Sequence, residues 1–201
     1  MVLSTICSLS YHAEGQSRWT HGVGIGVAIT DFVIEADISI DREKYAFDQL
    51  ANRSFYIWNK YNLTEKLQFT TSPGFSWRGA RFVREGFNYN GIYLVTPTLL
   101  EYNVYGPMSL GAGIEYSHVI SLGESSDDEV YNLTSQVTTR HLFSCIANVR
   151  YMLGQHTSLN IAYNHGLNSF YKLSRFNTAG GTVDHINLRN KGLQITFIFH
   201  T

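Results

Sequence analysis

The sequence predicts an all-β fold, an antiparallel up-and-down β-barrel that crosses a membrane. Three observations predict it: alternating segments recur with the roughly ten-residue length that a tilted membrane strand needs, short and long connections alternate, and the chain ends in an aromatic-rich strand. In that strand Leu193, Ile195, Phe197 and Phe199 point to one side, because side chains alternate along a strand. A C-terminal strand of this kind is typical of bacterial outer-membrane barrels.

The composition favours a barrel with one apolar and one uncharged polar face. The chain has 201 residues, enough for a single barrel domain over 1–201. Charged residues make up 15%, against roughly 25% in soluble domains. Hydrophobic residues are nevertheless only 44%, and the mean hydropathy is −0.12. Ser, Thr, Asn, Gln, Gly and Tyr replace the missing charge, which is the balance expected of a lipid-facing wall and a polar lumen.

Several function classes are disfavoured by the same counts. A net charge of −1 provides no basic field for nucleic acid. Cys7 and Cys145 have no metal-ligand spacing; a disulfide between them stays open, and Cys145 is expected to face lipid. Residues 1–7 lack the basic segment of a signal peptide, so we expect the export signal to be absent from this numbering.

The alternation sets the strands and the connections. Strands are expected near 2–11, 19–29, 32–40, 53–62, 66–78, 91–104, 108–119, 140–152, 157–167 and 191–200. Long loops, expected to be extracellular, fall near 41–52, 79–89, 121–139 and 169–190. The apolar phase flips at Thr30-Asp31, and a tight turn there gives ten strands, the count we favour. A bulge there, with residues 1–18 as a tail, gives eight.

The polar face decides between a membrane barrel and a soluble lipocalin-like one. It carries small or uncharged residues such as Gly24, Gly113 and Asn148, which suit a narrow lumen better than a wet surface. Aromatic residues near strand ends are expected at the membrane interface: Trp19, Trp77, Tyr102, Tyr116 and Tyr151. The charges expected in the lumen are Glu35, Asp37, Arg78, Glu101, Glu115 and Arg150. We interpret them as an internal salt-bridge network that plugs the barrel, with a proton or solute path as the alternative.

From about residue 53 onward, four segments carry a resemblance to a known family: Trp58–Leu67, Leu94–Tyr102 with its central Pro97, Tyr163–Leu167 and Asn190–Ile195. In these segments the chain resembles the PorT-like outer-membrane barrels of Bacteroidota. The resemblance implies a location in the outer membrane, reached through the barrel-assembly machinery that reads the last strand. Some members serve protein secretion. Independently of the family, a Pro inside a strand marks a bulge or an irregular pairing.

The expected function is that of a small integral outer-membrane protein with a plugged polar lumen, a structural or accessory component of an assembly such as secretion or export machinery. Its partners would be lipid or lipopolysaccharide, the barrel-assembly machinery and a larger outer-membrane complex. Small residues on the outer face (Ala112, Cys145, Ala147) would allow the barrel to pack closely against a protein of that complex. No catalytic, cofactor-binding or metal-binding set is predicted.

The alternative is a rim-active enzyme, an omptin-like protease or a lipid A-modifying barrel. His118 and His141 flank a long loop that carries Ser125, Ser126, Asp127, Asp128 and Glu129. The consecutive acids could bind a cation, but they lack an EF-hand spacing.

Overall fold

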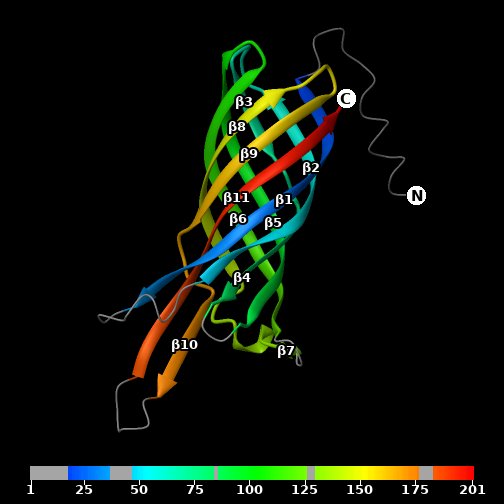
Figure 1. Cartoon of the computed structure of the whole chain (residues 1–201). Helices are drawn as coiled ribbons and strands as arrows, with labels where there is room; N and C mark the ends of the chain where they lie inside the picture. Colours follow the sequence, from blue (N-terminus) through cyan, green and yellow to red (C-terminus); the bar gives the residue numbers. More distant parts are fainter. Residues whose placement is uncertain (1–17, 37–46, 84–85, 126–129, 177–182) are drawn as a thin grey trace, which may run out of the picture.

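The computed structural model is a single antiparallel sheet rolled into a closed barrel (Figure 1). It describes residues 18–36, 47–83, 86–125, 130–176 and 183–201. The strands are β1 (Trp19–Ala36), β2 (Phe47–Asn62), β3 (Leu67–Thr71), β4 (Gly74–Phe82), β5 (Asn88–Tyr105), β6 (Met108–Ser125), β7 (Val130–Asn132), β8 (His141–Met152), β9 (Thr157–Gly166), β10 (Tyr171–Phe176) and β11 (Val183–His200). A short 3₁₀ helix, η3, covers Thr134–Gln136.

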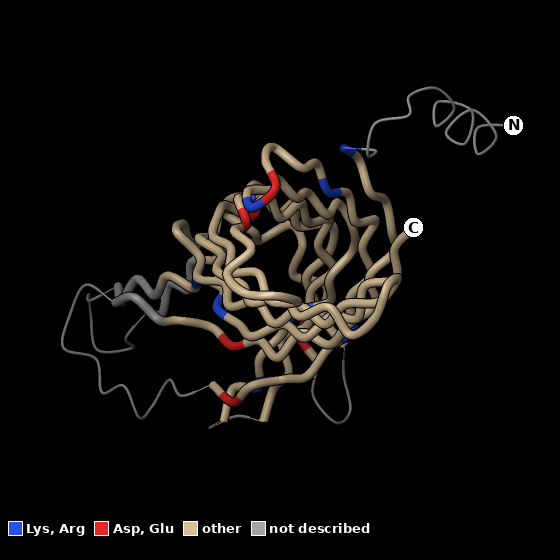
Figure 2. The backbone as a smooth tube through the Cα atoms, turned by 90° about the horizontal axis from the view of Figure 1, so that it is seen from above, with Lys and Arg blue, Asp and Glu red and all other residues tan. Residues whose placement is uncertain are grey.

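The ring has eight strands, because two of its members are each interrupted once. β3 and β4 lie end to end between β2 and β5, and β9 and β10 both pair with β11. β7 is a short addition to the end of β6. The ring closes where β1 pairs with β11 in unbroken register from Gly22↔His200 to Ala36↔Ile186. Seen from above in Figure 2, the backbone encloses a central space.

The described residues therefore form the eight-stranded ring of the alternative and not the ten-stranded ring that we favoured. β11 has β1 on one edge and β9 on the other, which leaves no place in the ring for residues 2–11; those residues lie outside the described part of the chain. The turn expected at Thr30-Asp31 is also absent, since both residues lie inside β1 without a bulge against β11.

Thr30 and Asp31 show why the sequence pattern misled. Thr30 points inward, accepts a hydrogen bond from Gly79 N at 2.9 Å and donates one to Gly79 O at 2.8 Å. Asp31 lies on the outer wall and pairs with Lys191 at 3.1 Å. The apolar phase changes because the lumen itself becomes apolar beyond this point, where Phe32 is packed inside the barrel.

Pro97 confirms the expected irregular pairing. It lies in β5 opposite the gap between β3 and β4, where Ser72 N donates to Pro97 O at 3.0 Å. Pro97 has no backbone N–H to donate, and the side of β5 on which that donor is missing faces the gap between β3 and β4. On the other side of β5, the pairing of Pro97 with Glu115 of β6 continues.

The two ends of the barrel differ as expected. The turns at 62–67, 105–108 and 152–157 lie with the C-terminus at one end, and β7 and β10 lie at the other (Figure 1). Much of each expected long loop is strand, however: β2 begins at Phe47, β4 runs to Phe82, β6 runs to Ser125, and β10 and β11 occupy most of 171–190. The 18 residues of β1, β5, β6 and β11 exceed the roughly ten that cross a membrane.

The outer wall is apolar, which contradicts the soluble alternative. Many large apolar side chains on it are 39–56% exposed, among them Val23, Ile25, Ile57, Leu100, Ile114, Leu193 and Phe197. A contiguous apolar surface of this extent is rare on soluble monomers. Trp19, Tyr102 and Tyr151 lie exposed near the short-turn end, and Trp77 and Tyr116 lie partly exposed nearer the other end. No helix in the described residues is long and apolar enough to span a membrane.

Candidate functional site

Among the described residues, the lumen holds two buried ion pairs, each made by side chains from strands that do not adjoin. Arg78 of β4 reaches Glu115 of β6, with Arg78 Nη2 2.7 Å from Glu115 Oε1, and both side chains are at most 1% exposed. Ser117 donates to Glu115 Oε1 at 3.1 Å, and Arg78 Nε donates to Ser76 Oγ at 3.2 Å. Because charges here are cut off from water, these partners are what stabilise them.

The second pair lies nearer the short-turn end. Arg150 Nη2 of β8 is 2.9 Å from Glu101 Oε2 of β5, and the guanidinium stands 5.0 Å from the centre of the Trp58 ring. Asn148 Nδ2 donates to Glu101 Oε1 at 2.6 Å and to Asn160 Oδ1 at 2.7 Å. This layer ties β2, β5, β8 and β9 together across the lumen.

The expected internal network is thus confirmed for four of the six predicted charges: Arg78, Glu101, Glu115 and Arg150. Glu35 lies in β1 and Asp37 lies outside the described residues, so neither is assigned to it.

A cavity of about 30 Å³ lies between these side chains and is lined by residues that include Tyr56, Trp58, Leu99 and Glu101. A cavity needs roughly 10–15 Å³ to hold one water molecule, so this one has room for about two.

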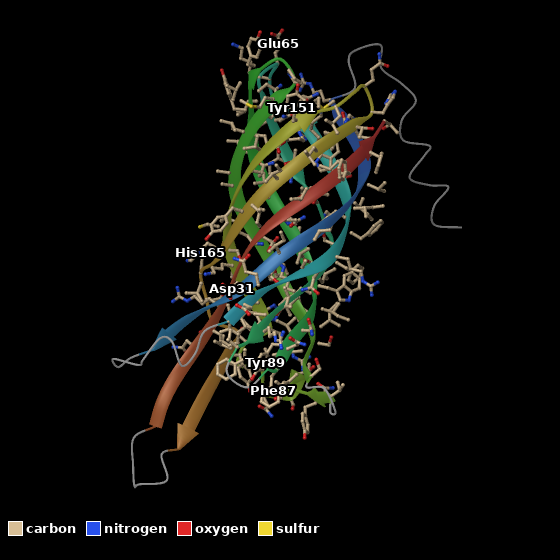
Figure 3. The ribbon with its side chains drawn as sticks, viewed as in Figure 1. Asp31, Glu65, Phe87, Tyr89, Tyr151 and His165 are labelled. Carbon is tan, nitrogen blue, oxygen red and sulfur yellow. The ribbon has the colours of Figure 1, made fainter. Side chains whose placement is uncertain are left out.

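An aromatic plug closes the lumen at the long-loop end. Its members are Phe32, Phe47, Phe82, Tyr89 and Phe170. The Phe32 ring centre lies 5.1 Å from that of Phe170 and 5.5 Å from that of Phe47, distances typical of packed aromatic pairs. Figure 3 shows Tyr89 and Phe87 at this end, opposite Glu65 and Tyr151. The plug continues the apolar interior that begins at Phe32, a feature that the alternation alone did not identify.

The rim histidines of the alternative enzyme hypothesis do come together. His118 of β6 and His141 of β8 are register partners, and their ring centres are 5.0 Å apart. Both lie on the outer wall rather than over the lumen. Within the described residues no carboxylate is hydrogen-bonded to either ring, and the acidic residues 127–129 lie outside the described part.

Solved structures with the same fold are small outer-membrane barrels. Ail, the attachment invasion locus protein of Yersinia pestis, aligns with a TM-score of 0.52 and 11% identity over 90% of this chain and 98% of its own. OprG, an outer-membrane protein of Pseudomonas aeruginosa, aligns with a TM-score of 0.51 and 13% identity over 91% of this chain and 95% of its own.

The chain has the fold of the small outer-membrane β-barrels. Together with the apolar wall, this fold places it among the proteins that cross the outer membrane with several strands. No family model matches the chain, and no curated protein sequence does. The resemblance to PorT-like barrels therefore rests on the residues quoted for it.

Proposed function

We propose that this protein is a small integral outer-membrane barrel with a closed lumen that acts as a structural or accessory component of a larger assembly, such as the secretion or export machinery that some PorT-like proteins serve. The observation that supports it is the set of described side chains inside the barrel: two buried ion pairs lie across the lumen, an aromatic plug lies at the long-loop end, and a cavity beside the Glu101 layer measures about 30 Å³. Such an interior leaves the outer wall as the surface through which the protein acts.

One part of that wall suits close packing against another membrane protein. Ala112 of β6 and Ala147 of β8 are register partners, and the exposed Cys145 lies on the same face of β8. Small residues let two membrane elements approach closely. The expected surroundings are lipid or lipopolysaccharide, and the barrel-assembly machinery would engage β11 during insertion.

Gentle detergent extraction from the native envelope, followed by native sizing, tests the proposal. We expect a species much larger than one 22.8 kDa chain with its micelle, containing a second protein in fixed ratio. Ala147→Trp should release the barrel as a monomer, whereas Ile161→Trp, on the neighbouring strand, should not. A parent protein recovered only as a monomer would contradict the accessory role.

A further inference from the structure

The outer wall carries a pair of imidazoles at the long-loop end of the ladder between β6 and β8. His118↔His141 is the last pair of that ladder, followed by the hydrogen bond from Val119 N to Arg140 O at 2.9 Å. Because the two residues face each other across adjacent strands and point outward, the sheet fixes the spacing of their Cβ atoms. The ring centres are 5.0 Å apart and the ring planes are tilted by 55°.

This spacing matches two imidazoles that share one metal ion. A zinc ion lies about 2.0 Å from each ligating nitrogen, which puts the two ring centres roughly 5 Å apart when the angle at the metal is near tetrahedral. The spacing therefore requires little movement of the strands.

A third side chain orients one of the rings. The Tyr116 hydroxyl and His141 Nδ1 are 2.7 Å apart and hydrogen-bonded, and the two rings are stacked. In the tautomer in which His141 Nδ1 carries the proton and donates it to the Tyr116 hydroxyl, the free lone pair of the ring lies on Nε2. Metal-bound histidines commonly use their other ring nitrogen for such a bond, which fixes the tautomer and the ring orientation.

We propose that His118 and His141 bind one divalent transition-metal ion, with Tyr116 as the residue that positions His141. Imidazole suits Cu²⁺, Ni²⁺ and Zn²⁺ and does not suit Mg²⁺ or Ca²⁺. No group of three or more His, Cys, Asp or Glu residues gathers around a common point in the described part of the chain. The site therefore uses two protein ligands, and water fills the remaining positions.

Binding to the tag-free full chain, refolded in detergent micelles at neutral pH, tests this site. Calorimetry with Cu²⁺, Ni²⁺ and Zn²⁺ should show saturable binding at this site, tightest for Cu²⁺. The electron paramagnetic resonance spectrum of bound Cu²⁺ should show coupling to two imidazole nitrogens. Mg²⁺ and Ca²⁺ should give no heat.

Single variants separate this site from other histidines. His118→Ala and His141→Ala should each weaken binding about tenfold or more, because the second imidazole otherwise binds intramolecularly. Tyr116→Phe should weaken it by roughly 10-fold, the lower end of the usual range for such partners. His21→Ala, at the opposite end of the barrel, is the control and should leave this binding unchanged. Unaltered binding in both His118→Ala and His141→Ala, or no saturable binding by the parent, would overturn the proposal.

Discussion

Removing the carboxylate of the Arg78–Glu115 pair should cost this barrel a large share of its stability. In Glu115→Leu the Arg78 guanidinium stays buried without a counter-charge, since Arg78 is 1% exposed and cannot turn to water. Breaking a buried pair from one side costs about 3–5 kcal/mol. We expect a loss in that range in the free energy of unfolding.

The geometry supports a value of this size. At 2.7 Å, two unit charges attract by roughly 6 kcal/mol at an effective dielectric constant of about 20. The remaining contacts of Arg78 recover only part of that energy: Ser76 Oγ at 3.2 Å from Nε, and the Tyr93 ring with its centre 5.6 Å from the guanidinium carbon.

Urea unfolding in lipid vesicles, followed by tryptophan fluorescence, measures the loss. The double variant Arg78→Met/Glu115→Leu should recover most of it, because no buried charge is left unpaired. Lys191→Met breaks the outer Asp31–Lys191 pair, whose side chains are 12% and 37% exposed, and should cost less than Glu115→Leu, because Phe32 N still donates to Asp31 Oδ1 at 2.7 Å. If Glu115→Leu unfolds at the same urea concentration as the parent, the description of Arg78 as a trapped charge is refuted.

Three further predictions concern the ring itself. With both native cysteines replaced, Val27→Cys/Ile195→Cys should form a disulfide in the folded protein, because the two positions are register partners of β1 and β11. Two thiols that stay unreacted would contradict the pairing of β1 with β11 that closes the ring. Gly74→Ala should lower the free energy of unfolding by about 2 kcal/mol in the same urea assay, because a Cβ there would meet the backbone of β2. Gly154→Ala has open space around the added Cβ and should change the free energy of unfolding by less than about 0.5 kcal/mol. A chain lacking residues 1–17 should still run faster on gels before boiling than after it, as folded barrels do, and loss of that difference would show that the segment is needed.

The sequence predicts the class of fold well because lipid-facing and lumen-facing side chains alternate along the strands of a membrane barrel. The lumen pairs of Arg78 and Arg150 were foreseeable, since a charge on the polar face of a narrow barrel needs a partner there. Pro97 likewise predicted an irregular pairing, which the structure has.

The strand count and the long-loop end could not be foreseen, because the apolar side chains of β1 change faces. Ile25 and Val27 face lipid, whereas Phe32 packs inside the barrel, so the same kind of residue marks opposite faces of one strand. The sequence gives no sign of where the interior becomes apolar, and a turn reproduces the pattern equally well. His118 and His141 could be placed from the sequence only at the two ends of one long loop, because it is the register of β6 and β8 that makes their rings face each other.

Ion conductance in planar lipid bilayers tests the closed lumen most directly. With two ion pairs and an aromatic plug filling the interior, the inserted full-length barrel should give no ion-conducting steps above the bare bilayer. The same preparation must show the shift in gel mobility on boiling, so that an absence of conductance can be assigned to a folded barrel. Reproducible steps of one size from such protein would contradict the account.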